Sequence, residues 1–223
     1  MKPIHHPPTE LLWSYVVGNA DAASSLLVAT HLALCPHCRR ETVAMEAAAG
    51  EMFEAIETAP VEDRAFDRIM ARIDAPPPAS QGRGPNMKSI NPIYPRPLRD
   101  HLLDGEPQSW RWIAEGVEAA DINLEVTGRR VRLIRVEPGR RFPRHGHGGD
   151  ELTLVLAGRY RSESGAFARG DVETADQTVV HQPVADSGAH CICLTVTRGA
   201  LLPGLLRSLM SSDFGRRWFG ARS

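Results

Sequence analysis

The sequence contains few cysteines, no surplus of charge of either sign and no long uninterrupted apolar segment. Its 223 residues include 26 Lys and Arg against 27 Asp and Glu, which gives a formal net charge of −1 at pH 7. Non-specific binding to nucleic acid requires a basic excess that displaces counterions from the phosphates, and this chain has none. We therefore expect no direct nucleic-acid partner.

The scarcity of long apolar runs and of cysteines bears on the location of the protein. The first residues, MKPIHHPP, lack the apolar stretch of a signal peptide, and the run LLVATHLALC is short and interrupted by His31. The four cysteines form two close pairs, Cys35/Cys38 and Cys191/Cys193, far from the density of a disulfide-stabilised secreted domain. We expect no membrane span and a reducing, cytoplasmic environment.

Proline is concentrated between residues 74 and 100. This stretch holds seven prolines and two glycines among small polar residues, a composition that forms neither a helix nor a paired strand. It is typical of a linker between two domains. The predicted organisation is a helical domain over residues 1–75, a proline-rich linker over 76–98, a β domain over 99–200 and a tail over 201–223.

Apolar residues before the linker recur with helical spacing. Predicted helices run from a cap at Thr9 to Gly18, from a cap at Asp21 to about Cys35, over residues 37–58, and from near Pro60 to residue 74. In the last helix, an apolar stripe recurs at i, i+3, i+4 and i+7 and consists of Phe66, Ile69, Met70 and Ile73. The pattern leaves two interpretations open: the stripe closes the core of the small domain, or it binds an apolar groove on a partner.

Short β segments follow the linker. They are VRLIRVEPG, ELTLVLAG, RYRSES, DVETAD and HCICLTVT, and turns rich in Gly, Pro, Asp and Ser separate them. Closely spaced strands without intervening helices predict an antiparallel sandwich or a small barrel. The pattern therefore predicts a multidomain chain, a small all-α domain followed by an all-β domain.

The stretch HLALCPHC places a histidine one helical turn before a pair of cysteines. On a helix, His31 and Cys35 project from one face, and the CPHC turn brings Cys38 back toward the same point. Zinc takes four such nitrogen and sulfur ligands in a closed structural site. His5 or His6, just before the first helix, would supply the fourth ligand.

Two other interpretations of these cysteines are weaker. A buried histidine beside two inert core thiols would show this spacing only by chance. A redox-active CxxC of the thioredoxin type needs a βαβ context, and no strand precedes this one. The zinc would be structural, because a domain of about 75 residues is marginal on its core alone. His37, inside the turn, is expected to point to solvent.

A second candidate metal site lies in GRRFPRHGHGGDELTLVLAG. Alternation places His145 and His147 on one face of an extended strand, and Glu151 can return across a glycine-containing turn. Two imidazoles and a carboxylate suit Zn, Fe, Mn, Ni or Cu, and His181 is the natural candidate for a fourth ligand. The alternative interpretation is a set of polar residues on an exposed turn.

Both constellations resemble known families. The first cupin motif, G-x5-HxH-x3-E-x6-G, is matched in full by Gly139, His145, His147, Glu151 and Gly158. The second cupin motif is matched in part, by Gly170 and His181. The amino-terminal histidine followed by HxxxCxxC resembles the zinc-binding anti-sigma domain. In this order, with a proline-rich linker between them, the two halves are similar to the ChrR-type anti-sigma factors across nearly the whole chain. The resemblance implies that the β domain is a cupin barrel.

The resemblance implies two zinc ions and their ligands. The structural zinc of the helical domain would be bound by His6, His31, Cys35 and Cys38, which selects His6 over His5. The second zinc, in the cupin domain, would be held by His145, His147, Glu151 and His181.

The resemblance also implies a partner and a mechanism. The helical domain would bind an extracytoplasmic-function (ECF) sigma factor in the cytoplasm and block its contact with core RNA polymerase. The cupin domain would be needed for the response to singlet oxygen and organic peroxides, after which the sigma factor is freed. The stripe in residues 60–74 then becomes the expected partner-binding element.

Two other functions compete with this one. A metal-dependent cupin enzyme, such as a dioxygenase, would use the helical domain for docking, because the cupin fold hosts enzymes and regulators alike. A zinc-finger DNA binder is disfavoured, because eleven Asp and Glu outnumber six Lys and Arg in the first 74 residues.

Overall fold

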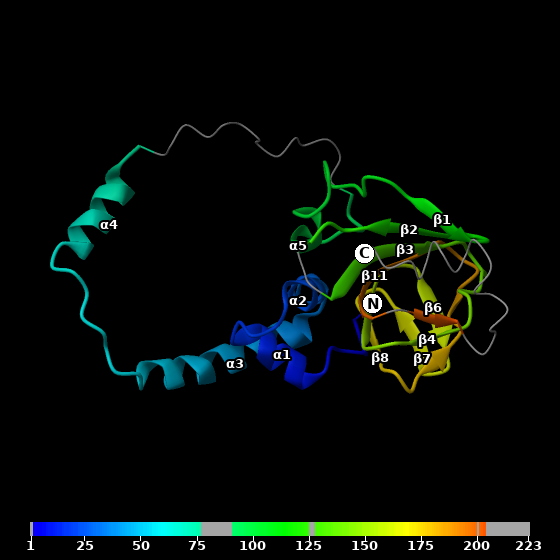
Figure 1. The fold of residues 1–223 in the computed structure, drawn as a ribbon, viewed down its shortest axis with the longest axis horizontal. Helices are drawn as coiled ribbons and strands as arrows, with labels where there is room; N and C mark the ends of the chain where they lie inside the picture. Colours follow the sequence, from blue (N-terminus) through cyan, green and yellow to red (C-terminus); the bar gives the residue numbers. More distant parts are fainter. Residues whose placement is uncertain (1, 77–90, 125–127, 200, 204–223) are drawn as a thin grey trace.

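The computed structural model describes residues 2–76, 91–124, 128–199 and 201–203, and it shows a helical part followed by a β barrel (Figure 1). The helices are α1 (Thr9–Val16), α2 (Ala22–Leu34), α3 (Pro36–Glu54), α4 (Ala65–Asp74) and α5 (Arg96–Arg99). The sequence pattern did not reveal α5, which lies at the end of the proline-rich segment. No helix in the described ranges is long and apolar enough to cross a membrane.

Local caps set the boundaries of α2 and α3. Asp21 caps α2 as predicted, because its carboxylate accepts the backbone N–H of Ser24 at 3.0 Å. Cys35 follows α2 and caps α3, whose first residue, Pro36, has no N–H to leave unpaired. The CPHC turn therefore begins a helix. That helix ends at Glu54, earlier than predicted.

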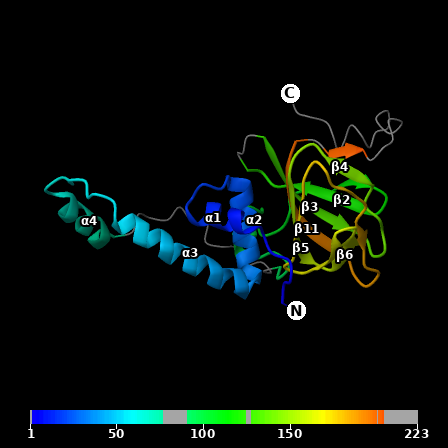
Figure 2. The ribbon, with the colours of Figure 1, turned by 90° about the horizontal axis from the view of Figure 1, so that it is seen from below.

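The end of α3 and all of α4 extend away from the rest of the molecule (Figures 1 and 2). α4 begins at Ala65 instead of near Pro60, and it buries none of its residues. Its stripe therefore does not close the core of the helical part, which was one of the two interpretations of the pattern. The apolar face of α4 lies open to solvent.

Twelve strands in the described residues form three antiparallel sheets, which together make the barrel. The six-stranded sheet has the order β1-β2-β3-β11-β5-β8, with β1 (Arg111–Ala114), β2 (Val117–Asp121), β3 (Arg129–Val136), β11 (Cys191–Arg198), β5 (Glu151–Ala157) and β8 (Val172–Ala175). The second sheet is β10 (Val184–Ala185), β6 (Arg159–Ser162) and β7 (Gly165–Ala168). The third is β12 (Leu201–Pro203), β4 (His145–His147) and β9 (Val180–His181). The five predicted β segments correspond to β3, β5, β6, β8 and β11.

The long strands of the six-stranded sheet are apolar on both faces, because each face borders its own core. Ile134 and Val155 belong to the cluster inside the barrel. Leu133, Leu154 and Leu194, at alternate positions of their strands, belong to a second cluster on the outer face. A sheet that is covered on both sides explains the nearly continuous apolar runs VRLIRV and ELTLVLA.

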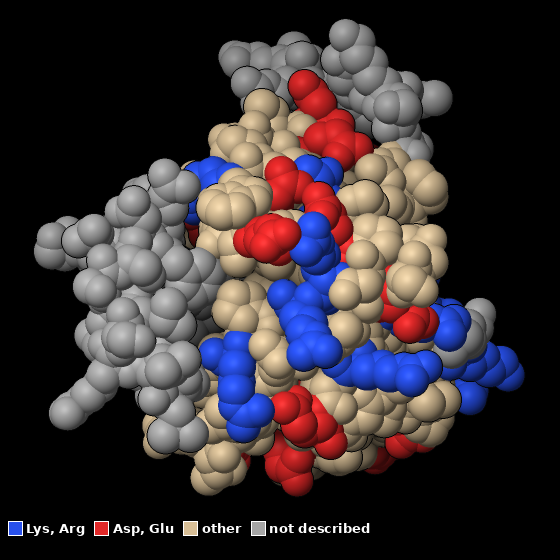
Figure 3. All heavy atoms as spheres, turned by 90° about the vertical axis from the view of Figure 1, so that its right-hand side faces the viewer, with Lys and Arg blue, Asp and Glu red and all other residues tan. Residues whose placement is uncertain are grey.

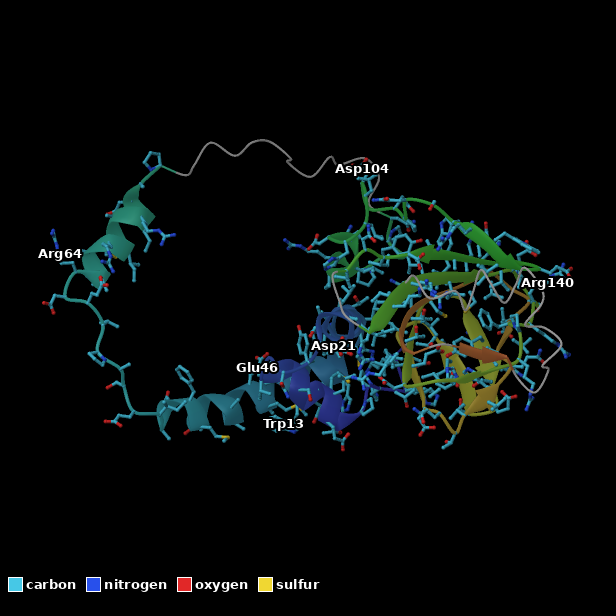
Figure 4. The ribbon with its side chains drawn as sticks, in the orientation of Figure 1. Trp13, Asp21, Glu46, Arg64, Asp104 and Arg140 are labelled. Carbon is cyan, nitrogen blue, oxygen red and sulfur yellow. The ribbon has the colours of Figure 1, made fainter. Side chains whose placement is uncertain are left out.

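Helix α2 covers the outer face of this sheet. Ala23, Leu26 and Leu27 of α2 belong to the same buried cluster as the strand leucines. Burial of a leucine such as Leu27 contributes about 2 kcal/mol to stability. At the beginning of α2, the carboxylate of Asp21 lies 2.8 Å from the guanidinium of Arg129 in β3 (Figure 4). Helix α2 and the barrel therefore share one hydrophobic cluster, while Leu12, Val28 and Met45 belong to a separate cluster of the helical part.

The last described residues belong to the barrel. Leu201–Pro203, assigned to the tail from the sequence, form β12 and pair with β4. The rest of the predicted tail, residues 204–223, lies outside the described residues, as do residues 77–90 of the predicted linker.

Candidate metal centres

Four residues converge at the amino-terminal candidate centre. His6 precedes α1, His31 lies in the last turn of α2, Cys35 separates α2 from α3, and Cys38 lies in the first turn of α3. Their potential ligand atoms all lie within 4.8 Å of one another. The Nδ1 atom of His6 is 3.5 Å from the sulfur of Cys35 and 3.3 Å from that of Cys38. The structure thus brings together the four residues that the resemblance selected.

His5 and His37 lie outside this cluster. The ring of His5 packs against Phe167 of β7, with 4.6 Å between the ring centroids. His37 is exposed, and its ring centroid lies 4.9 Å from that of His6. The geometry therefore favours His6 as the fourth donor, a choice that residue spacing alone left open.

The amino-terminal cluster suits a cation. The Nδ1 atom of His31 donates a hydrogen bond to the carbonyl oxygen of Gly170 at 2.8 Å, so Nε2 presents a lone pair. That Nε2 atom is buried and has no hydrogen-bond partner among the described residues. Burial lowers the pKa of His31 to about 4, and burial together with Cys35 raises the pKa of Cys38 to about 12. Two neutral imidazoles and two sulfurs fit Zn²⁺, which would compensate the charge of buried thiolates.

Three strands build the second candidate centre. His145 and His147 lie on β4, Glu151 begins β5, and His181 ends β9. β4 pairs with β9 in a register that places His145 opposite His181. The potential ligand atoms lie within 4.8 Å of one another, and all four residues are buried. The interpretation of these residues as polar groups on an exposed turn is therefore wrong.

Three imidazole nitrogens face one another in this second centre. The Nε2 atom of His181 lies 3.1 Å from Nε2 of His145 and 3.2 Å from Nε2 of His147. The Nδ1 atom of His145 donates to the carbonyl oxygen of Pro143 at 2.9 Å, which leaves Nε2 of this residue without a proton. Lone pairs that converge in this way repel one another unless a proton or a cation lies between them.

Burial also favours a cation at the second centre. It lowers the pKa of His145 to about 3 and that of His147 to about 4, so both imidazoles are neutral and able to donate a lone pair. Burial raises the pKa of Glu151 to about 7. A divalent cation would reverse this effect and keep the carboxylate ionised. Three nitrogens and one carboxylate suit zinc and the neighbouring transition metals.

Glu173 of β8 is a further residue of this centre that the sequence pattern did not reveal. Its carboxylate lies 3.6 Å from Nδ1 of His181, accepts the hydroxyls of Tyr160 and Ser162 at 2.6 Å each, and also accepts the hydroxyl of Ser164. Burial opposes its ionisation, but the contacts with His181 and the three hydroxyls bring the pKa of Glu173 down to about 2. The ionised carboxylate faces the ring of His181 as an ion-pair partner, beyond hydrogen-bond distance. The sequence signal, an acidic residue within the β segment DVETAD, does not show which side chains face inward.

A cavity of about 60 Å³ adjoins the second centre. Its wall is mostly apolar and includes Ile134 and Phe142, together with the buried side chain of Arg132. The sulfurs of Cys191 and Cys193 also line it, 3.7 Å apart. The cavity has room for a few water molecules or for a molecule of similar size.

Comparisons with known proteins match both halves of this architecture. Residues 99–201 match the family described as the ChrR Cupin-like domain. The anti-sigma-E factor ChrR of Cereibacter sphaeroides is 40% identical over 205 residues, which cover 88% of this chain and 91% of that protein. The chain belongs to the ChrR family of anti-sigma factors.

A solved structure of a ChrR protein shares the fold. The crystal structure of Rhodobacter sphaeroides SigE in complex with the anti-sigma ChrR matches with a TM-score of 0.75 and 36% identity. The match covers 86% of this chain and 98% of the matched chain. The predicted fold class, a helical part followed by a cupin barrel, is confirmed.

Exposed apolar side chains of this ChrR-family protein gather on α4 and on the end of α3. Those on α4 are the predicted partner-binding residues, Phe66, Ile69, Met70 and Ile73, which are 71%, 56%, 39% and 68% exposed. Met52 and Phe53 of α3 are 76% and 74% exposed. We call these six residues the α3–α4 surface. Exposed apolar residues usually occur singly, whereas these six lie on two consecutive helices.

The side of the ChrR-family barrel that faces away from the helices has charges of both signs (Figure 3). Arg140 lies at the edge of the barrel (Figure 4), and its guanidinium is 2.8 Å from the carboxylate of Glu115. Arg144 similarly lies 3.6 Å from Glu163. Interleaved charges produce no field of a single sign that would draw a polyanion onto this face.

Proposed function

We propose that this protein is a cytoplasmic anti-sigma factor that sequesters an ECF sigma factor and releases it under oxidative stress, by singlet oxygen or an organic peroxide. The observation that carries the proposal is the α3–α4 surface, an exposed apolar surface in a chain 40% identical to an anti-sigma factor. A bound sigma factor cannot contact core RNA polymerase, so transcription from its promoters stays off. Release restores that transcription.

The sigma factor would bind the α3–α4 surface. Phe66, Ile69, Met70 and Ile73 lie on a helix with no buried residues, so a partner can cover all four of them. Complete burial of one such side chain contributes about 1.5 to 3 kcal/mol, and several together are needed to offset the cost of association. Met and Phe suit an apolar groove, because the first adapts its shape and the second buries a large area.

We assign a structural zinc to the amino-terminal centre, held by His6, His31, Cys35 and Cys38. Four protein donors complete a tetrahedral set and leave no position for a substrate. Zinc would supply folding free energy, about 10 kcal/mol or more in small zinc domains. Because Cys35 caps α3 and Cys38 lies in its first turn, the same donors would also fix the direction in which α3 presents the partner surface.

We assign a second zinc to the barrel, held by His145, His147, Glu151 and His181, and we place the response to oxidants there. The adjoining cavity of about 60 Å³ is large enough for an oxygen molecule or for the O–O group of a small peroxide. Release requires that the oxidised state of the protein bind the sigma factor less tightly than the resting state does.

A metal-dependent cupin enzyme of the dioxygenase type is the second candidate, and the cavity beside three imidazoles is the observation that favours it. Two features make it the weaker candidate. Typical small-molecule sites measure roughly 300 to 1,000 Å³, far more than this cavity. If the metal is zinc, four protein donors also complete a tetrahedral site without an open position for a substrate.

The experiment is a pull-down of the full-length chain with the sigma factor encoded by the neighbouring gene, before and after exposure to singlet oxygen or an organic peroxide. We expect an equimolar complex that dissociates on exposure. A complex that persists under both oxidants would contradict the stress response. A chain that binds no sigma factor, but consumes oxygen together with an organic substrate, would be the enzyme instead.

A further inference from the structure

The barrel holds the segment that carries His6. The backbone N–H groups of Ile4 and His5 donate to the same carboxylate oxygen of Asp171, at 2.7 and 3.0 Å. The backbone N–H of Val172 donates in turn to the carbonyl oxygen of His5 at 3.1 Å. The amino-terminal segment therefore lies against the beginning of β8 (Figure 1). His6 follows directly, so its position depends on these contacts.

Asp171 and Gly170 pack closely against this amino-terminal segment. Asp171 is 2% exposed, and its other carboxylate oxygen accepts the N–H of Ala168 at 2.8 Å, so both oxygens have backbone partners. Gly170 has φ +92°, and a Cβ atom at this position would lie 2.6 Å from the ring of Pro3. A larger residue at 170 would therefore collide with the segment and strain the backbone.

The same turn contacts a second donor of the amino-terminal centre. The carbonyl oxygen of Gly170 accepts the hydrogen bond from Nδ1 of His31 at 2.8 Å. Two of the four donors, His6 and His31, are thus positioned by the turn between β7 and β8. The other two, Cys35 and Cys38, are positioned by the beginning of α3.

We propose that the amino-terminal metal centre spans the two halves of the protein, with Asp171 of the barrel as a positioning residue for His6. This rests on the proposed metal binding by the amino-terminal donors. Outer contacts of this kind hold ligands in place, and their loss typically lowers metal affinity about 10- to 100-fold. Linkage makes the coupling reciprocal: whatever loosens the turn at Asp171 weakens metal binding, and loss of the metal loosens the contacts with the barrel.

Strand β8 connects the turn at Asp171 to the second candidate centre. Two residues beyond Asp171, Glu173 contacts His181, a proposed ligand of the barrel centre. Asp171 directly precedes β8 and Glu173 lies within it, so a shift of β8 would displace both carboxylates. The beginning of β8 is therefore a direct structural link between the two candidate centres.

Cobalt titration of the full-length protein tests the role of Asp171. Thiolate ligands give bound Co²⁺ an intense near-ultraviolet charge-transfer band, and a centre of imidazoles and carboxylate gives none. The band reports the amino-terminal centre, and its absence from protein in which both Cys35 and Cys38 are replaced by serine assigns it. We expect Asp171→Ala to bind cobalt there about 10- to 100-fold more weakly than wild type. Asp171→Asn keeps an oxygen for Ile4 and His5, so we expect a smaller loss. Asp186→Ala, a surface control in the barrel, should match wild type.

Wild-type cobalt affinity in folded Asp171→Ala protein would overturn the coupling and leave the metal assignment intact. Absence of the band from wild-type protein would overturn the metal assignment, and the coupling with it.

A second measurement applies if Asp171→Ala protein does not fold. Hydrogen exchange of zinc-loaded wild-type protein is compared with that of Cys35→Ser protein. We expect faster exchange at the amides of Ile4, His5 and Val172 in Cys35→Ser protein, with unchanged exchange in β11. Equal exchange at the three amides in both proteins would overturn the coupling.

Discussion

The Nδ1 atom of His31 donates a hydrogen bond to the carbonyl oxygen of Gly170 over 2.8 Å, although 139 positions separate the two residues in the sequence. His31 belongs to α2, whereas Gly170 lies in the turn before β8. The contact fixes the tautomer of a buried imidazole and aims its other nitrogen at the sulfurs of Cys35 and Cys38. It also joins the helical part of this ChrR-family protein directly to its cupin barrel.

Replacement of Cys35 or Cys38 by serine tests the amino-terminal centre. We expect either variant to lose one equivalent of zinc, to unfold at a lower temperature and to lose its sigma factor, because the two sulfurs supply half of the donors and α3 begins at them. Elemental analysis and a pull-down measure the two effects. Cys191→Ser, which alters a sulfur in the barrel, is the control and should keep this zinc. Undiminished sigma binding by metal-free Cys35→Ser protein would refute the structural role.

The α3–α4 surface is tested by Phe66→Asp. A central apolar anchor of an interface is worth about 2 kcal/mol or more, so we expect the sigma factor to bind about 30-fold more weakly or worse. The melting temperature should not change, because Phe66 is 71% exposed. Titration calorimetry measures the affinity. Arg64→Ala, just before α4, is the matched control. Equal affinities of Phe66→Asp and wild type would place the sigma factor elsewhere.

Glu173→Gln tests the orientation of His181 in the barrel. The amide removes the negative charge that faces Nδ1 of His181, so we expect about 10-fold weaker metal binding at the barrel centre. Competition with a zinc chelator measures this affinity, and the thiolate centre serves as an internal reference. Glu115→Gln changes an exposed carboxylate outside this centre and should have no effect. An unchanged chelator profile in Glu173→Gln protein would show that Glu173 does not support His181.

Leu27→Ala tests the shared core of helix and barrel. Leu27 is fully buried between α2 and the six-stranded sheet, and such a truncation costs about 2 to 5 kcal/mol. We expect the whole described core, barrel included, to melt earlier in one cooperative transition. Differential scanning calorimetry shows this directly. The exposed Leu103→Ala is the control. A barrel transition that stays at the wild-type temperature would mean that the two halves fold independently.

Local sequence patterns predicted the donors that lie close together in the sequence. His31, Cys35 and Cys38 lie within eight positions, so helical geometry and one turn bring them together. His145 and His147 share a face of one strand for the same kind of reason. The strands that the sequence missed, such as β1, β7 and β12, are short or carry few β-branched residues, so their periodicity is weak.

Contacts between distant segments could not be predicted from these patterns. The spacing of residues did not distinguish His5 from His6, because the choice depends on how Asp171 holds the amino-terminal segment. Glu173 is one acidic residue among many until β8 places it beside His181. The linker composition indicated two domains, but it gave no sign that α2 packs on the sheet. Periodicity shows which face of an element is apolar and not which element covers it.

Competition with core RNA polymerase tests the central claim most directly. The zinc-loaded full-length protein is mixed with its ECF sigma factor and core enzyme, and the amount of holoenzyme is measured. We predict that the protein at equimolar ratio prevents holoenzyme formation and that exposure to singlet oxygen or an organic peroxide restores it. Holoenzyme formation that is unaffected by the protein, with or without an oxidant, would contradict the account.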